Sequence, residues 1–311
     1  MQYSAGPTFS EGLLLAQASL TPSFLLEQVF NGLVRGGFYA LLALGLSIIF
    51  GMLRIVNFAH GAMYMLGAFV AYEGALQFHL PFFAALIVAP IVVAAFGLLI
   101  ETLLLRRLYN LDPLYNLLFT FALVLVIEDA MRLQFGALGS PYEMPALLSG
   151  QTNLGLFAYP TYQLFVIVVS ILVCLAVYLV VERSPLGARI RAATENPELT
   201  RAFGINTSRL VSGVFAFGVG LAAFAGVLNA PYTNVTPSMG DSIIISTFAI
   251  VVIGGLGSLR GSIVTAFALG VIQALGAVFY PPIANTLIFI VMVLVILFKP
   301  SGLFGTTERA A

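Results

Sequence analysis

Long stretches of this chain contain no Lys, Arg, Asp or Glu, and this feature limits its possible folds more than any other. A helix needs about 20 mainly apolar residues to cross the hydrocarbon core of a bilayer, so the longest stretches have room for two such helices each. Only 8% of the residues are charged, against about 25% in an ordinary soluble domain. The chain is therefore predicted to be an all-α, polytopic integral membrane protein. The uncharged stretches are Gly36 to Leu53, Gly74 to Ile100, Met144 to Val181, Val211 to Gly240 and Gly261 to Phe298.

Charged residues, Pro and Gly divide the chain into eight or nine predicted transmembrane helices. The segment 243–259 is short and ends in glycines, so it is predicted either to cross fully or to be a re-entrant or broken helix. A full crossing places Arg260 on the same side as most other basic residues and gives nine spans. These spans are residues 30–53, 60–76, 82–105, 113–135, 162–182, 210–230, 243–259, 262–279 and 283–298.

The basic residues predict how the chain is oriented. Five of the thirteen Lys and Arg residues lie between Arg183 and Arg209, and short loops rich in Lys and Arg are typically cytoplasmic. Nine crossings then place the N-terminus outside and the C-terminus inside. Residues 1–24 are predicted to be a non-cytoplasmic leader, residues 25–304 a single transmembrane domain containing the cytoplasmic loop 183–209, and residues 305–311 a cytoplasmic tail.

Small residues at a spacing of four predict close backbone contact between helices. Lipid supplies no hydrophobic force between spans, so helices associate through packing at such faces. The alternative is chance, because Gly and Ala are common in membrane helices. The three rows are Gly67, Ala71 and Ala75; Gly218, Ala222, Gly226 and Ala230; and Ala266, Gly270 and Ala274.

Charges near the ends of spans are predicted to have mainly structural roles. Glu128 and Asp129 precede Arg132 by four and three residues, which predicts local ion pairs on a helix. Glu101 is expected near the inner boundary, within reach of water and of a neighbouring arginine. Arg35, expected at the start of a span, is predicted to extend its side chain to the membrane surface.

Several classes of function lack their required residues. The only lysine, Lys299, precedes Pro300, so the chain contains no Gly-Lys-Ser/Thr phosphate-binding loop. The two histidines, His60 and His79, have no partners at metal-ligand spacing, and Cys174 is interpreted as a buried apolar residue. A net charge of zero, without a basic patch, gives no indication of nucleic acid binding. No arrangement typical of a catalytic site is present.

Two segments differ from ordinary span sequence. The first is Ile55 to Gly61, which brings Asn57 and His60 to the junction of two apolar helices. The second, Ile253 to Gly261, contains four glycines, which disfavour helix and leave backbone groups free to face a cavity. Both are interpreted as breaks beside a permeation path or, equally, as tight turns between helices.

The loop between Arg183 and Arg209 is predicted to contain a short amphipathic helix. Asn196 is a favoured N-cap, Pro197 fits the first helical turn and Gly204 ends the segment, which gives a helix over about 197–203. A positively charged, unstructured loop is the alternative, and it explains the arginines but not this arrangement. A structured helix at this position indicates docking to a cytoplasmic partner.

Six segments are together specific for one family, although each alone is weak. They resemble the permeases of branched-chain amino acid ABC importers over residues 25–304, particularly the H-type member of the paired H and M permeases. The six segments are Asn31-Gly32, Tyr39 to Gly45, Asn57 to Gly61, Arg191 to Asn206, Gly254 to Ser258 and Lys299 to Gly305.

The resemblance implies the ABC importer permease fold in a bacterial inner membrane. It implies a core of two permeases, with an M-type chain or a second copy as partner, two cytoplasmic ABC ATPases that carry ATP and Mg, and a periplasmic solute-binding protein. This chain would then bind no cofactor and catalyse no reaction. The predicted ATPase-coupling residues are Arg191, Ala192, Glu195, Asn196, Pro197, Ala202 and Gly204. The predicted residues of the substrate path are Asn57, His60, Gly254, Gly255, Gly257 and Ser258.

The predicted function is inward transport of leucine, isoleucine, valine or a similar solute, driven by partner ATPases. Relatives that import urea, short amides or small organic or aromatic acids share the architecture and remain an alternative. A secondary transporter that works without ATP is a second alternative. It is disfavoured because no central pair of acidic residues is found in the predicted spans.

Overall fold

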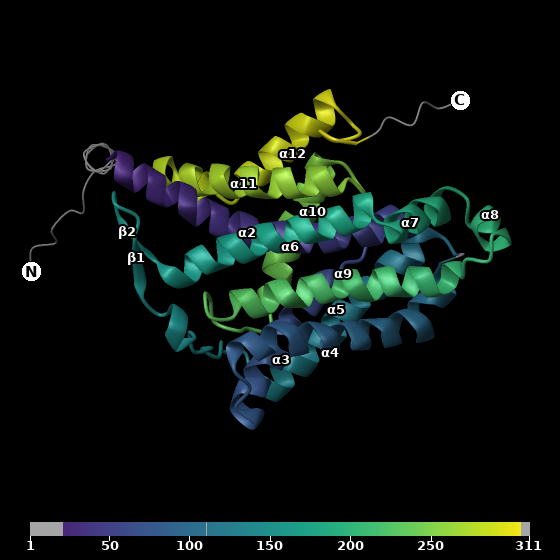
Figure 1. The fold of residues 1–311 in the computed structure, drawn as a ribbon, viewed down its shortest axis with the longest axis horizontal. Coiled ribbons are helices and arrows are strands. Elements are labelled where there is room, and N and C mark those ends of the chain that lie inside the picture. Colours follow the sequence, from purple (N-terminus) through teal and green to yellow (C-terminus); the bar gives the residue numbers. More distant parts are fainter. Residues whose placement is uncertain (1–20, 110, 306–311) are drawn as a thin grey trace, which may run out of the picture.

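The computed structural model describes residues 21–109 and 111–305. Most of the predicted leader and all but the first residue of the predicted tail lie outside the described residues. The helices and strands are labelled as in Figure 1. They are α2 (Pro22–Leu53), α3 (Ala59–Phe78), α4 (Phe82–Leu103), η1 (Leu105–Leu108), α5 (Pro113–Phe135), η2 (Ala146–Leu148), β1 (Gln151–Asn153), β2 (Ala158–Pro160), α6 (Thr161–Arg183), α7 (Pro185–Glu195), α8 (Pro197–Ala202), α9 (Thr207–Asn229), α10 (Met239–Gly254), α11 (Leu259–Phe279), η3 (Pro281–Ile283) and α12 (Leu287–Phe298).

Each of the nine predicted spans corresponds to a helix of the structure. Six helices in the described part of the chain are long and apolar enough to cross a membrane, namely α2, α4 with η1, α5, α6, α9 and α11. The helices α10 and α12 are apolar but shorter, with 16 and 12 residues. The protein is therefore an all-α polytopic membrane protein, and its only described strands are three residues each.

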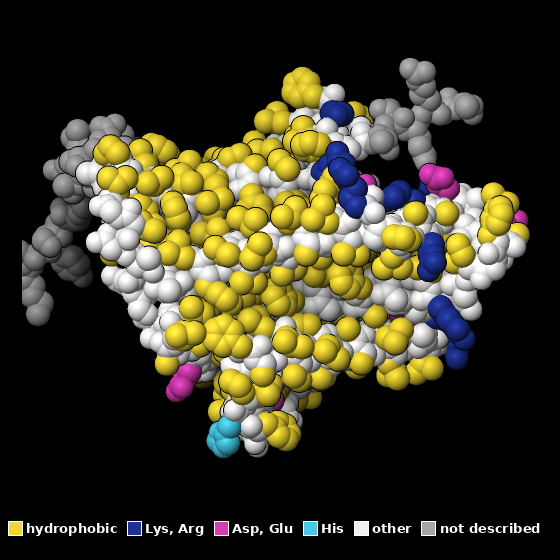
Figure 2. All heavy atoms as spheres, viewed as in Figure 1, with side chains coloured by type: hydrophobic (Ala, Val, Ile, Leu, Met, Phe, Trp, Pro, Cys, Tyr) yellow, Lys and Arg dark blue, Asp and Glu magenta, His cyan; other side chains and the backbone are white. Residues whose placement is uncertain are grey.

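The two ends of the helix bundle differ in charge. Figure 2 shows that Lys and Arg side chains on the visible face gather at the end where Figure 1 draws α7 and α8, while apolar side chains cover the middle. We call this end the basic end. The opposite end carries the antiparallel hairpin of β1 and β2, in which Gln151 pairs with Pro160, and we call it the hairpin end.

The hairpin was not predicted, and it packs over the start of α2. The Tyr159 ring contacts Phe30 edge to face, with ring centroids 5.4 Å apart. The Tyr159 hydroxyl donates a hydrogen bond of 2.8 Å to Oδ1 of Asn31. Strands this short carry too little sequence pattern to be recognised.

The rows of small residues do bring helix backbones together, as predicted. Gly226 of α9 lies against the carbonyl oxygen of Tyr64 on α3, and Gly270 of α11 lies against Gly36 of α2. A Cβ atom on Gly32 would come within 2.5 Å of the Cα atom of Val271. Such close approaches pack α2, α9 and α11 into the centre of the bundle.

Helix α3 begins inside the bundle rather than at its basic end. After Arg54 the chain turns back, and His60 Nε2 lies 3.1 Å from the carbonyl oxygen of Leu42. Leu42 is about three turns, or roughly 16 Å, from the end of α2 at Leu53. The segment 55–58 therefore connects two helices inside the bundle, and whether it borders a permeation path stays a prediction.

Two predictions about charged residues were wrong. Glu101 does not reach water, since it is fully buried. Arg35 does not lie at the start of a span, because α2 begins at Pro22, which places Arg35 about 20 Å into the helix. The predicted ion pairs of Arg132 are confirmed, at 2.6 Å to Glu128 and 3.4 Å to Asp129.

Candidate functional site

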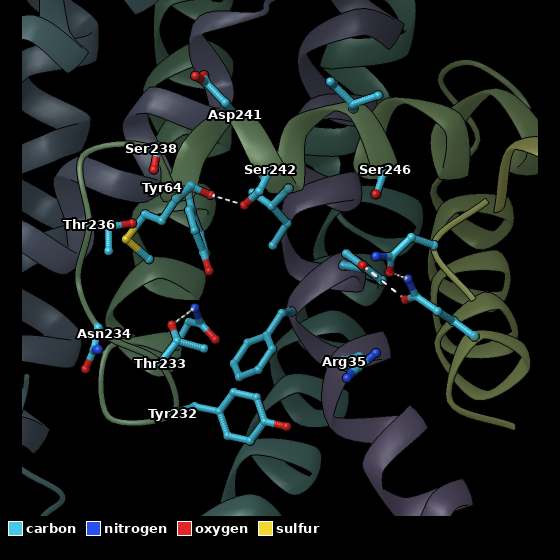
Figure 3. Close-up of a pocket in the computed structure, with 18 of the residues that line it drawn as sticks. Arg35, Tyr64, Tyr232, Thr233, Asn234, Thr236, Ser238, Asp241, Ser242 and Ser246 are labelled. Carbon is cyan, nitrogen blue, oxygen red and sulfur yellow. Dashed lines mark hydrogen bonds between the residues drawn. The ribbon is translucent and has the colours of Figure 1, made fainter. Parts of the chain in front are cut away.

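A polar cavity of about 640 Å³ opens among helices that are distant in sequence. Helices α2, α3, α10 and α11 form its walls, together with the connection between α9 and α10 and the residues around the start of α12 (Figure 3). Most of the lining side chains labelled in Figure 3 are polar. The cavity lies in the half of the bundle nearer the hairpin end, because the α9–α10 connection lies there. A cavity of this size holds a small polar solute.

A chain of hydrogen bonds crosses one wall of this cavity. The Tyr39 hydroxyl of α2 donates to Oε1 of Gln273 on α11 at 3.2 Å. Nε2 of Gln273 donates to Oδ1 of Asn285, just before α12, at 2.9 Å. Each of the two accepting carbonyl oxygens has a second lone pair that remains available to a solute.

The cavity is lined by two charged side chains, Arg35 of α2 and Asp241 of α10. Figure 3 shows them at opposite ends of the cavity, and they form no ion pair with each other. Arg35 also lines a second cavity of about 360 Å³, together with Tyr232, Glu27 and Tyr159. The second cavity lies between the first and the hairpin, so Arg35 stands between the hairpin end and the larger cavity.

Between the cavity and the basic end, helices α2 and α9 are in direct contact. A Cβ atom on Gly45 would lie 2.6 Å from the carbonyl oxygen of Gly218 and 3.0 Å from the His60 ring. Nearer the basic end, the hydroxyl groups of Ser47 and Ser262 are hydrogen-bonded to each other. The cavity is thus separated from the basic end by direct backbone contact.

The predicted substrate-path residues Asn57 and His60 lie in the break before α3, and they are 2% and 0% exposed. They do not line the polar cavity. Neither the Asn57 amide atoms nor His60 Nδ1 has a hydrogen-bond partner in the described part of the chain. Buried polar groups without partners are uncommon in folded proteins, and a role for these two residues in the path stays a prediction.

The other predicted path residues lie at the basic end, far along the chain from Asn57. Gly254 accepts a hydrogen bond of 3.0 Å from the backbone of Phe304, and Gly255 has a φ of 103° in close contact with Gly305. Ser258 caps α11 by accepting from the backbone of Gly261 at 3.2 Å. The segment Ile253 to Gly261, which we call the glycine segment, therefore holds the residues after α12 against the end of α10.

Only one predicted path residue meets the predicted coupling residues. Gly257 lines a small cavity of about 210 Å³ together with Arg191 and Glu195 of α7. The structure therefore brings part of the glycine segment against α7. It does not bring this segment together with Asn57 and His60.

The predicted coupling residues all lie on α7, α8 or the turns beside them, and all are exposed. The predicted helix is present as α8, and its Asn196 cap accepts from the backbone of Leu199 at 2.9 Å. Gly204 follows α8 with a φ of 80°. Helix α7 was missed, although its signal is the same, since Ser184 caps it and Pro185 opens it.

Exposed apolar side chains on α8 were also missed. Leu199 of α8 is 55% exposed and Phe203, which directly follows the helix, is 78% exposed. Helix α8 extends from the basic end of the bundle (Figure 1). The spacing of four residues between them places both on one face of the helix. Contiguous exposed apolar patches can mark sites of protein contact, so this face is a candidate docking surface.

A buried polar cluster links the basic ends of α4 and α9. Arg106 donates to both carboxylate oxygens of Glu101, at 3.2 Å and 3.1 Å, and also to the hydroxyl of Ser212 on α9. Burial and the Glu101 carboxylate raise the pKa of the Tyr109 hydroxyl. This hydroxyl therefore stays protonated and donates to Glu101 at 3.0 Å.

Helix α8 is joined to this cluster through the first turn of α9. Nε of Arg201 donates to the hydroxyl of Thr207 at 2.7 Å. Thr207 opens α9, and Ser212 follows little more than one turn later.

No group of three or more potential metal ligands occurs among the described residues.

Comparison with known proteins assigns the family. The family described as "Branched-chain amino acid transport system / permease component" matches residues 28–297. The permease protein BraD of a high-affinity branched-chain amino acid transport system in Pseudomonas aeruginosa is 32% identical over 91% of this chain and 96% of its own length. The corresponding LivH protein of Salmonella typhimurium is 30% identical over 92% of this chain and 97% of its own length.

The chain is also similar to the second type of permease in such systems. The LivM protein of Salmonella typhimurium is 27% identical over 87% of this chain and 68% of its own length. No solved structure matches the chain. With a family match over most of its length and relatives at 30% identity or more, this chain belongs to the branched-chain amino acid transport system permease family.

Proposed function

We propose that this chain is the membrane-spanning subunit of an ATP-driven importer that moves branched-chain amino acids into the cell. The observation that carries the proposal is the polar cavity within a family whose members are named as permeases of branched-chain amino acid transport systems. The cavity is closed toward the basic end and large enough for one amino acid. This arrangement supports a solute path that opens alternately to the two sides.

The orientation follows from the charge of the two ends. Arg54 follows the end of α2, which contacts α7, and Arg106 and Arg107 lie in η1 beside the start of α9, so these three residues belong to the basic end. We infer that this end is cytoplasmic. The hairpin end then faces the outside of the inner membrane. A periplasmic solute-binding protein would deliver the solute at that end, into the cavities lined by Arg35.

Partner subunits would supply the energy. ATP and Mg would be held by two cytoplasmic ATPases, which dock on α7 and α8 through the exposed Leu199 and Phe203. Similarity to both LivH and LivM supports a pair of related permeases, in which an M-type chain or a second copy completes the core.

The contacts at the basic end suggest how movement of the ATPases reaches the cavity. A displacement of α8 pulls on Thr207 through Arg201. Because Ser212 ties the same helix to Glu101 of α4, α8, α9 and α4 would move together. The same helix α9 carries Gly218, which closes on Gly45 below the cavity. Rigid movement of α9 is therefore suited to opening that closure.

Purification of the tagged chain from its native membrane tests the proposal. We expect two P-loop ATPases and a second permease to co-purify in mild detergent, with ATPase activity in the purified complex. Glu195→Arg changes an exposed residue at the end of α7 and should lower the stimulation of ATPase activity by solute-loaded binding protein. A chain that purifies without any ATPase, and transports solute in liposomes without ATP, would favour a secondary transporter instead.

A further inference from the structure

Arg35 is a cationic side chain inside a membrane span with no ion pair among the described residues. It is exposed, and it lines both the larger cavity and the smaller cavity at the hairpin end. A charge at this depth is costly unless it faces water or a partner, so intramembrane arginines are commonly functional. Water in the cavity explains how Arg35 is tolerated there, but it does not explain why an arginine is present.

The placement of Arg35 on α2 is specific to the cavity. Arg35, Phe38 and Tyr39 follow each other at helical spacings of three and four residues, and all three line the larger cavity. On another face of the same helix, Gly36 packs against Phe267 of α11. The guanidinium group therefore belongs to the wall of the cavity, on a different face of α2 from the one that packs closely on α11.

The chemistry around Arg35 is asymmetric. On the same side of the cavity, the wall consists of the neutral groups Tyr39 of α2, Gln273 of α11 and Asn285, which are hydrogen-bonded in series. The cavity's carboxylate, Asp241, lies at the opposite end, as Figure 3 shows. This half of the cavity thus presents one cation and several neutral hydrogen-bonding groups.

We propose that Arg35 binds the carboxylate of the transported solute and makes the cavity select carboxylic acids over their amides. The planar guanidinium group forms paired hydrogen bonds with a carboxylate, which a neutral amide cannot match. The carbonyl oxygens of Gln273 and Asn285 each have a lone pair available for an ammonium group. Recognition of the ammonium group by neutral oxygens keeps binding weak enough for release.

This inference rests on the proposed function, and uptake into proteoliposomes that contain the full complex tests it. The variants are Arg35→Lys, Arg35→Gln and Arg35→Met, and the control is Arg107→Gln. Arg107 is exposed at the basic end and lines neither cavity. The same binding protein delivers the same labelled leucine to every variant, so differences in uptake report on the permease.

We expect Arg35→Gln and Arg35→Met to lower the initial rate of uptake by roughly tenfold to a hundredfold, the loss typical of a hydrogen-bonded charged partner. Arg35→Lys should lie between these variants and the unchanged protein, because it keeps the charge but not the paired geometry. Stimulation of ATPase activity by loaded binding protein should persist in all of them. Its persistence shows that the variants fold and assemble.

Two results would overturn the role of Arg35 without touching the proposed function. One is uptake by Arg35→Met within twofold of both the unchanged protein and Arg107→Gln. The other is uptake by Arg35→Gln equal to that of the unchanged protein, because this neutral side chain still donates hydrogen bonds and such a result would show that the positive charge is not needed. Failure of the unchanged complex to import any branched-chain amino acid would instead contradict the proposed function.

Discussion

The hydroxyl of Ser212 on α9 donates a hydrogen bond of 2.7 Å to the buried carboxylate of Glu101 on α4. The Arg106 guanidinium and the Tyr109 hydroxyl contact the same carboxylate. One acidic side chain therefore holds together two helices that run side by side through the bundle. Loss of this carboxylate should weaken the contact between α4 and α9 near the point where α8 connects to α9.

Glu101→Leu is expected to destabilise the protein. It leaves the Tyr109 hydroxyl without its acceptor and Arg106 without its ion-pair partner, and each buried polar group without a partner costs about 1 to 3 kcal/mol. Thermal unfolding of the purified protein in detergent measures the effect. The control Asp129→Asn removes a carboxylate that is 70% exposed and paired with Arg132, and it should change the midpoint little. Equal midpoints for the two variants would contradict the structural role of Glu101.

Gly226→Ala is expected to lower stability and yield far more than Gly213→Ala on the same helix. A Cβ atom at Gly226 would collide with the carbonyl oxygen of Tyr64, a backbone atom that cannot move without α3, whereas a Cβ atom at Gly213 meets nothing within 4 Å. Gly213→Ala should even raise helix stability slightly. Fluorescence-detected size-exclusion chromatography after stepwise heating compares the two variants. A Gly226→Ala protein as stable as Gly213→Ala would show that α3 and α9 are not this close.

The helices themselves could be predicted from the sequence, whereas most of the contacts between them could not. The nine helices were predictable because a membrane helix is defined by a local run of apolar residues, and α8 because its cap, Pro and Gly are neighbours in sequence. The row containing Gly226 was also recognised locally. Its partner on α3, however, is known only from the structure.

The polar cavity was missed because its walls come from distant segments. Arg35, Gln273 and Asn285 meet only after α2, α11 and the segment before α12 have packed together. A signal did exist, since Gln273 and Asn285 are strongly polar side chains within the uncharged stretch from Gly261 to Phe298. The burial of Glu101 was missed for the same reason, because Ser212 lies 111 residues away.

Gly204→Val is expected to weaken coupling, whereas Gly204→Asn should be tolerated. The φ of Gly204 is 80°, a region that a β-branched residue adopts only with strain and that Asn adopts more readily. A side chain there meets no neighbour within 4 Å, so the backbone conformation alone separates the two variants. The measurement is ATPase activity of the reconstituted complex with and without loaded binding protein. Equal stimulation in the two variants would contradict a role for this turn in coupling.

Phe203→Ser and Leu199→Ser are expected to release the ATPases while leaving the chain itself stable. Both side chains are exposed, Leu199 on α8 and Phe203 directly after it, so their loss removes apolar contact area from the proposed docking surface and not from the core. Co-purification of the ATPases with the tagged chain measures the effect. The matched control is Leu147→Ser, because Leu147 is 80% exposed but belongs to η2, in the segment between α5 and the hairpin. Retention of the ATPases by both α8 variants would place their docking site elsewhere.

The most direct test of the whole account is uptake of labelled leucine by the purified complex in proteoliposomes, with ATP supplied on the side that carries α7 and α8. The account predicts that leucine accumulates against its gradient when binding protein is present on the opposite side, and that accumulation stops when ATP is replaced by a non-hydrolysable analogue. Accumulation that continues without hydrolysis, or that requires ATP on the hairpin side, would contradict it.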